Sequence, residues 1–185
     1  MEKSIIFTIQ SWYVLGPIFL LGLIWLIGRA KRQGKNRNLG QYIVLISFEI
    51  YLLSVIHLVF FPIDVNIGIY ANQTPWYKTI NFIPILTIDA KTFLLNVIML
   101  IPFGIYLPFL SKTVDSVKKA AKLGFMLSLS FELLQLLIRV TLGNGRSTDV
   151  NDLLANTAGA VIGFLIFKRL FKITSLKRFF QWLQR

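Results

Sequence analysis

"GRSTDVNDLLANTAGAVIG", residues 145–163, begins as a polar loop and continues as an apolar helix. Its charged and amide side chains fall where the chain would enter a lipid bilayer. Ionisable side chains are costly in lipid, so those in or beside a membrane span usually face the interior of a helix bundle and mark function. This stretch therefore predicts a membrane helix with one polar, functional face.

The composition of the whole chain also indicates a membrane protein. The chain has 185 residues, of which 55% are hydrophobic, and a mean hydropathy of +0.66. These values are too high for a soluble domain of this size. The net charge of +12 does not indicate nucleic acid, because Lys and Arg stand in short clusters between apolar runs. The chain contains no cysteine, which excludes disulfides and thiol chemistry.

Five apolar runs approach the length of about 20 residues that a helix needs to span a bilayer. We predict an all-α fold: a single integral membrane domain over residues 1–185, built as a polytopic bundle of about five transmembrane helices. The predicted spans are residues 12–28, 42–61, 92–110, 123–142 and 150–167. The basic tail, 168–185, interleaves Phe, Leu and Trp with Lys and Arg. This pattern indicates an amphipathic helix on the inner leaflet, and the alternative is a frayed, solvated end.

The basic residues predict the orientation of this bundle. Five lie in 29–41, four in 111–122 and six in 168–185, whereas the opposite side carries four. By the positive-inside rule the N-terminus is outside and the C-terminus is cytoplasmic. The first run has no small-residue cleavage site and carries its flanking charge on the C-terminal side, so we interpret it as a retained anchor. We therefore expect a multi-pass protein of the cell membrane.

Two polar stripes follow the fourth and fifth spans. At 100° per residue, the first covers about 60° and the second about 80° of a helix surface. The members are Ser128, Glu132, Gln135 and Arg139 on the fourth span, and Asp149, Asp152, Asn156, Gly159 and Gly163 on the fifth. The short loop 143–149 makes the two helices antiparallel neighbours. We expect the stripes to enclose an outward-opening pocket, with Asp149 and Asp152 near the surface and Glu132 roughly 15 Å below the end of its helix.

The third span adds an amide and a predicted kink. Pro102 removes a backbone hydrogen bond, and the resulting bend would point Asn96 at the polar stripes. Gly159 and Gly163 form a GxxxG motif, which lets another backbone approach closely in lipid. We predict structural roles for these two glycines, for Pro102 and for Gly104.

The sequence does not decide the roles of two further features, the ionisable residues of the second span and the outer loop. Glu49 and His57 on the second span are offset by about 80° and share no narrow face. We interpret His57 as a hydrogen-bonded structural residue and assign no role to Glu49. The outer loop 62–91 contains "NQTPWYKTINFIPIL", whose aromatic residues suit the headgroup region. Its length beside a polar pocket favours a lid or binding element, and the alternative is a loop that lies on the membrane.

Four blocks of the chain together resemble the VanZ-like membrane proteins. They are INFIP at 80–84, NVIMLIPFG at 96–104, FELLQ at 131–135 and the stretch 145–163, and they cover about half of the chain in the family's order. The resemblance implies a link to resistance against teicoplanin, a lipoglycopeptide that binds cell-wall precursors. It also implies family motif positions at Asn96, Pro102, Gly104, Glu132, Gln135, Arg146, Asp149, Asp152, Asn156 and Gly159. Residues 1–60 carry no such resemblance.

We rank a binding protein first among the functions of the predicted pocket. A drug, a lipid headgroup or a cell-wall precursor would lie between the third, fourth and fifth spans, and resistance to teicoplanin would follow. Arg146 would engage an anionic group, as guanidinium groups do. The candidate binding residues are Asn96, Gln135, Arg139, Arg146 and Asn156. Membrane lipids are the expected surroundings, and the oligomeric state stays open.

A membrane enzyme ranks second and a small transporter or lipid flippase third. Glu132, Asp149 and Asp152 are candidates for acid–base groups acting on a lipid-linked or envelope substrate, or for ligands of a hard divalent cation. No established catalytic motif is present, so the sequence names no reaction, cofactor or metal. For transport, Glu132 and Glu49 would carry protons, but no internal repeat is evident. The plainest alternative is that Glu132, Gln135 and Asn156 only hydrogen-bond helices together.

Overall fold

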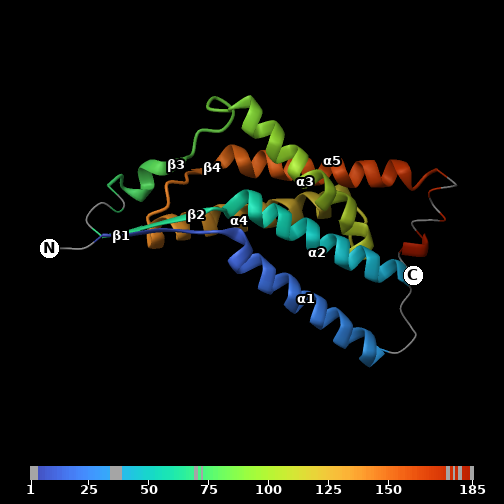
Figure 1. Cartoon of the computed structure of the whole chain (residues 1–185). Helices are drawn as coiled ribbons and strands as arrows, with labels where there is room; N and C mark the ends of the chain where they lie inside the picture. Colours follow the sequence, from blue (N-terminus) through green and yellow to red (C-terminus); the bar gives the residue numbers. More distant parts are fainter. Residues whose placement is uncertain are drawn as a thin grey trace.

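The computed structural model describes residues 4–33, 39–68, 71, 73–173, 176, 178 and 181–183. Within these residues five long helices form a bundle (Figure 1). They are α1 (Ser11–Gln33), α2 (Leu39–Phe60), α3 (Ala90–Leu110), α4 (Val117–Leu142) and α5 (Val150–Leu170). All five are long and apolar enough to cross a membrane, which confirms the predicted fold class of about five transmembrane helices.

Two short strand pairs at one end of the bundle are additions to the predicted fold (Figure 1). β1 (Ile5–Ile9) pairs antiparallel with β2 (Ile63–Ile67), which joins the chain before α1 to the chain after α2. The 3-10 helix η2 (Trp76–Thr79) leads into β3 (Ile80–Asn81). β3 pairs in parallel with β4 (Thr148–Asp149), which joins the loop before α3 to the start of α5.

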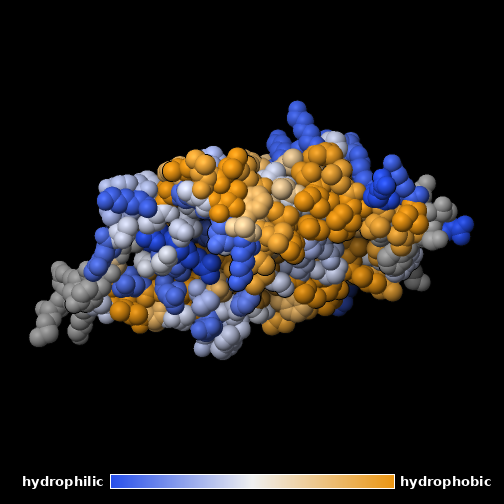
Figure 2. All heavy atoms as spheres, turned by 90° about the horizontal axis from the view of Figure 1, so that it is seen from above, coloured by the Kyte–Doolittle hydropathy of each residue, from blue (hydrophilic) through white to orange (hydrophobic). Residues whose placement is uncertain are grey.

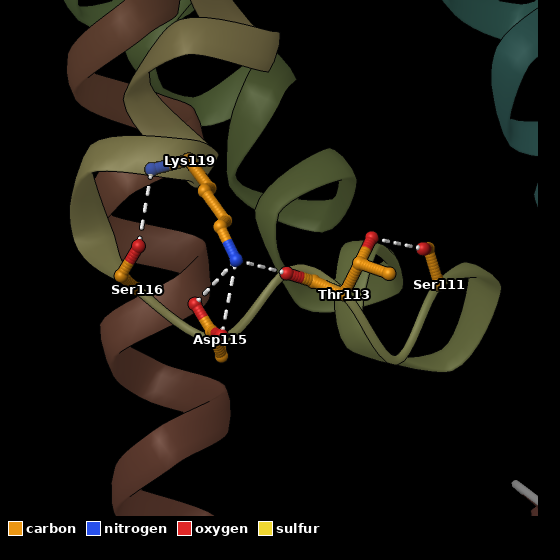
Figure 3. A network of polar contacts seen from close by, with 5 residues as sticks. All are labelled: Ser111, Thr113, Asp115, Ser116 and Lys119. Atoms are coloured by element: carbon orange, nitrogen blue, oxygen red, sulfur yellow. Dashed lines mark hydrogen bonds and ion pairs between the residues drawn. The ribbon is translucent and has the colours of Figure 1, made fainter.

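A compact polar turn connects α3 to α4 at the opposite end (Figures 1 and 3). Ser116 caps α4, because its Oγ accepts a hydrogen bond from the Lys119 N–H at 3.4 Å. The Lys119 ammonium donates to the Thr113 carbonyl at 2.7 Å and lies 3.0 Å from the Asp115 carboxylate. Its hydrogen bond holds the pKa of the Asp115 carboxyl below the usual range. This local network stabilises the reversal that makes α3 and α4 antiparallel.

The polar residues gather towards the two ends of the molecule. Figure 2 shows hydrophilic atoms there, with a hydrophobic band between them. The strand pairs lie at one end, whereas the α3–α4 turn and the end of α5 lie at the other (Figure 1). This separation matches the two sides assigned from sequence. The orientation itself, with the N-terminus outside, stays a prediction, and Lys3, Lys35 and Arg37 lie outside the described residues.

The predicted amphipathic tail is described only in part. Residues 181–183 are helical, and a Cβ added to Gly40 at the start of α2 would lie 2.8 Å from the Trp182 carbonyl oxygen. The tail therefore returns to the bundle at this point. The rest of the prediction falls partly on residues outside the described set, which are 174, 175, 177, 179, 180, 184 and 185.

α3 and α5 make the most extensive helix contact, and glycines allow it. A Cβ on Gly159 would overlap the carbonyl oxygen of Val97, and one on Gly163 would overlap that of Ile101. From the other helix, a Cβ on Gly104 would overlap the carbonyl oxygen of Ala160. Small residues drive helix association in lipid by this kind of backbone approach. The three glycines therefore lie where the backbones of α3 and α5 approach closely, and their structural roles stay a prediction.

α3 bends along its length, as Figure 1 shows, and Pro102 and Pro108 lie within it. Pro102 has no N–H to donate to the preceding turn. Beside this point, Tyr51 of α2 donates its hydroxyl to the carbonyl of Met99 at 2.8 Å. Leu100 and Phe164 are fully buried in the α3–α5 core next to the bend. Asn96, in the first half of α3, contacts Asp152 of α5.

Replacing Gly163 by alanine tests the backbone contact between α3 and α5. We expect Gly163→Ala to lower the free energy of unfolding by about 1–3 kcal/mol, because the new methyl group overlaps backbone rather than a flexible side chain. Gly28→Ala in α1 is the matched control, because nothing lies within 4 Å of the added carbon. The measurement is the thermal unfolding of both purified variants in the same detergent. Equal melting temperatures would show that the contact is not tight.

Single cysteines test the orientation, because the chain has none of its own. We expect a membrane-impermeant maleimide to label Lys78→Cys on intact cells and to label Lys112→Cys only after the cells are opened. Both side chains are exposed, at opposite ends of the bundle. The reverse pattern would place the strand pairs in the cytoplasm and contradict the charge argument.

Candidate functional site

The segment 143–149 runs back along α4 instead of crossing its end. α4 ends at Gly143, whose φ of 66° reverses the chain. Arg139 then donates from Nη1 to the carbonyl of Arg146 at 2.8 Å. Further along, the N–H of Asp149 donates to Oε2 of Glu132 at 3.0 Å. α5 therefore begins beside Glu132, about three helical turns before the C-terminal end of α4.

The path of this segment corrects the depths in the membrane that were predicted for Asp149 and Glu132. Asp149 was expected near the outer surface, well above Glu132, but the two residues are hydrogen-bonded neighbours. The length of a short loop sets how far the chain travels but not its direction, which is why sequence alone missed the reversal. As a result the acidic residues of α5 lie beside the middle of α4.

Asp149 caps α5 and does not belong to its helical stripe. One carboxylate oxygen accepts from the Asn151 N–H at 2.8 Å, as an N-cap does. The other oxygen accepts from the side-chain amide of Asn81 at 3.0 Å. Since the first N–H groups of a helix have no partners within it and lipid supplies none, this capping satisfies a need of the fold. Both Asp149 oxygens are thus engaged away from the main cavity.

Asn151 fastens the outer loop to the start of α5. It is 3% exposed, and its side-chain oxygen accepts from the Ile85 N–H at 2.8 Å. Its amide nitrogen donates to Thr87 Oγ1 at 3.1 Å and to the Ile83 carbonyl at 3.4 Å. Ile85 has a φ of 70°, an unfavourable value for a β-branched residue, which this bond helps to hold. Sequence reasoning missed Asn151, although a buried amide in the first turn of an apolar helix must find partners.

Interhelical hydrogen bonds join α3, α4 and α5 at the level of Ser128. The Asn156 amide donates to Ser128 Oγ at 2.9 Å, and Ser128 Oγ donates to the Asp152 carbonyl at 3.3 Å. From α3, the Asn96 amide donates to the Asp152 carboxylate at 2.6 Å. The structure thus brings the polar residues of the three helices together.

A cavity of about 600 Å³ lies between α2, α3, α4 and α5. The predicted pocket was bounded by three helices, and α2 forms a fourth wall. Its polar lining residues are Ser54, Thr92, Asn96, Glu132, Gln135, Arg146, Asp152 and Asn156. Its remaining lining residues are Tyr51, Val55, Leu58, Val59, Leu95, Ile98, Met99, Pro102 and Phe131.

Two cavity side chains fasten the end of α2. Gln135 donates its amide to the Val59 carbonyl at 3.1 Å, and Arg146 donates Nη2 to the Phe61 carbonyl at 3.1 Å. The last carbonyls of a helix lack partners within it, so these bonds satisfy the C-terminus of α2. They also keep the Arg146 guanidinium at the cavity, where it supplies a positive charge.

The inner wall of the cavity is rich in hydrogen-bond acceptors. Oδ1 of Asn156 and Oε1 of Gln135 are buried and accept no hydrogen bond from the part of the chain that the structure describes. The carboxylates of Glu132 and Asp152 lie in the same wall. An unpaired buried acceptor is unfavourable, and native proteins contain few of them. This wall is therefore suited to a ligand that donates hydrogen bonds.

Several predicted residues lie away from the cavity. Arg139 does not line it and instead supports the reversed loop through the carbonyls of Asn144 and Arg146. His57 is exposed in a groove facing α1. Glu49 packs against Gly22 of α1, where a Cβ would overlap its carboxylate.

The outer loop does not behave as a lid in this structure. None of its described residues, 62–68, 71 and 73–91, lines the cavity. Its large apolar side chains are exposed, including Trp76, Tyr77, Phe82, Ile85 and Leu86. This arrangement favours the alternative interpretation, a loop that lies in the headgroup region.

The described residues hold no group of three or more Asp, Glu and His side chains that could bind a metal ion. This finding agrees with the separate engagement of Asp149. The two remaining carboxylates of the cavity, Glu132 and Asp152, also accept hydrogen bonds from the protein.

Five apolar helices, four of which surround a partly polar cavity, define a polytopic membrane protein. Residues 48–172 match the sequence profile of the VanZ/LLP1 family, so the chain belongs to this family. The matched region begins earlier than the four motif blocks and contains every residue that lines the cavity. The chain is 30% identical over 125 residues to Protein VanZ of Enterococcus faecium, which covers 64% of the chain and 69% of that protein. No solved structure matches the chain.

Removing the side chain of Asn151 tests the link between the outer loop and α5. We expect Asn151→Ala to speed amide hydrogen exchange at residues 83–87, because Ile85 loses its acceptor. Thr79→Ala is the control, since the Thr79 hydroxyl bonds only within its own turn, to the Trp76 carbonyl. Exchange by mass spectrometry measures both variants. Unchanged exchange in Asn151→Ala would show that the loop is held by other contacts.

Proposed function

We propose that this protein protects the cell against teicoplanin by binding a ligand of the cell membrane in the cavity between α2, α3, α4 and α5. The ligand is the drug, a lipid headgroup or a cell-wall precursor. The observation that carries the proposal is the acceptor-rich wall, where Asn156 and Gln135 each keep an unpaired oxygen. Interhelical packing alone does not explain acceptors that find no partner among the described residues.

Charge at the cavity further supports a polar ligand. Glu132 and Asp152 supply two carboxyl groups, and Arg146 supplies positive charge. Ionisable groups within a membrane usually serve binding, transport or catalysis, because their cost in lipid is high. A ligand with an anionic group and hydrogen-bond donors is complementary to this set.

Membership of the VanZ/LLP1 family supports the link to the drug. Because teicoplanin acts on cell-wall precursors, a protein that holds an envelope molecule within the membrane would reduce the action of the drug at the surface.

An enzyme is the second candidate, because two carboxylates line one cavity. Such a pair can act as a general acid and a general base. Binding ranks first because Glu132 already accepts the Asp149 N–H and Asp152 already accepts the Asn96 amide. Mass spectrometry of the drug and of the extracted lipids separates the two: a mass change that depends on Glu132 would favour the enzyme.

Neutralising the cavity carboxylates tests the proposed function. We expect Glu132→Gln and Asp152→Asn to reduce the minimum inhibitory concentration of teicoplanin to that of cells without the protein, because charge at the cavity is lost. Asp115→Asn is the matched control, since this carboxylate is exposed in the α3–α4 turn and should leave resistance unchanged. Membrane levels of each variant are measured by immunoblot. Full resistance in both cavity variants at normal levels would refute the proposal.

A further inference from the structure

We infer that the ligand reaches the cavity sideways from the bilayer, between α2 and α3, and that it is a phosphate-bearing amphiphile whose head group donates hydrogen bonds. This inference rests on the proposed function and names its ligand class and route. Three independent features carry it: the side chains at the rim, the closure of the other helix seams and the chemistry of the wall.

The rim of the cavity faces lipid. Leu58 of α2 and Leu95 and Ile98 of α3 all line the cavity, yet they are 64%, 56% and 52% exposed. All three lie in helices long and apolar enough to cross a membrane, so their exposed surface meets acyl chains. A side chain that lines a cavity and also faces lipid marks a lateral opening.

The other seams around the cavity are closed by specific contacts. α3 and α5 meet backbone to backbone at Gly104, Gly159 and Gly163. α2 is bonded to α4 through Gln135 and to the reversed loop through Arg146. Between α2 and α3 the hydrogen bond from Tyr51 to the Met99 carbonyl lies below the exposed rim. An amphiphile can therefore enter between α2 and α3, at the exposed rim beyond the Tyr51 hydrogen bond.

The hydrogen-bonding groups that line the cavity determine which lipid head group can bind there. The side-chain oxygens of Asn156 and Gln135 accept no hydrogen bond from the described residues, and the carboxyl groups of Glu132 and Asp152 line the same cavity. A ligand that brings N–H or O–H groups matches the two amide oxygens. Arg146 presents a guanidinium at the same cavity, and guanidinium groups pair well with phosphate oxygens.

Ethanolamine and glycerol head groups both meet this requirement, whereas choline does not. Each follows a phosphate with donors, an ammonium in the first case and hydroxyls in the second. The quaternary ammonium of choline has the charge of ethanolamine but no N–H. A cavity of about 600 Å³ fits such a head group while the acyl chains remain in the bilayer.

The first test compares lipid head groups on the unaltered protein. The full-length chain is placed in nanodiscs with trace photoreactive phosphatidylethanolamine, phosphatidylglycerol or phosphatidylcholine that carries the same acyl-chain diazirine. We expect the ethanolamine or glycerol probe to crosslink to peptides at the α2–α3 rim of the cavity about tenfold more than the choline probe. The stronger of the two identifies ammonium or hydroxyl donors. Equal crosslinking by all three would overturn the inferred head-group chemistry.

The second test blocks the route with a matched pair of variants. Leu95→Trp fills the rim. Leu94→Trp is the control, because Leu94 lies next to Leu95 on α3 and is 58% exposed but does not line the cavity. We expect Leu95→Trp to reduce cavity crosslinking about tenfold and Leu94→Trp to leave it unchanged. Ile98→Trp gives a second rim variant if Leu95→Trp does not accumulate. Unchanged crosslinking in a folded rim variant would overturn the lateral route.

The two proposals fail in different ways. If Glu132→Gln loses resistance but the rim variants bind lipid normally, the cavity acts as proposed and its ligand arrives from the aqueous side. If all cavity variants keep full resistance, the proposed function fails, whichever lipid crosslinks.

Discussion

The hydrogen bond from the Asp149 N–H to the Glu132 carboxylate is the contact on which the arrangement of the site depends. It allows α5 to begin inside the bundle, about three turns below the end of α4. A helix that begins at this depth exposes N–H groups that lipid cannot satisfy. The Glu132 carboxylate and the Asp149 cap satisfy them, and a negative charge at a helix N-terminus is favourable.

This low starting point of α5 decides what its side chains meet. Asp152 and Asn156 lie beside Ser128 and Asn96 rather than at the membrane surface. The glycines further along α5 then meet α3, and the backbones pack without a gap. The polar groups are left facing the space towards α2, where the cavity forms. The fold thus uses the amide nitrogens of Asn156 and Gln135 to join helices and leaves the oxygens of the same two side chains unpaired among the described residues.

The sequence predicted those features that depend on composition and helical period. Apolar length identified the five spans, and the spacing of Glu132, Asp152 and Asn156 identified a shared polar face. It did not predict the reversal of 143–149, because the φ of Gly143 and the Arg139 hydrogen bonds set that path. For the same reason Asp149 was assigned to a stripe, although it caps the helix.

Two other differences have physical reasons. α2 was left out of the pocket because its cavity residues are mostly apolar and carry no polar stripe. The strand β2 has an alternating pattern, IDVNI, that is typical of a half-buried strand. It was missed because its partner β1 lies before α1, more than fifty residues earlier in the chain.

A crystal structure grown in a lipid mesophase that contains phosphatidylethanolamine would test the central claim most directly. The account predicts a lipid between α2 and α3, with a donor atom of its head group within hydrogen-bond distance of the Asn156 and Gln135 side-chain oxygens and its phosphate near Arg146. A cavity in which these oxygens pair with protein side chains and no lipid lies between the two helices would contradict it.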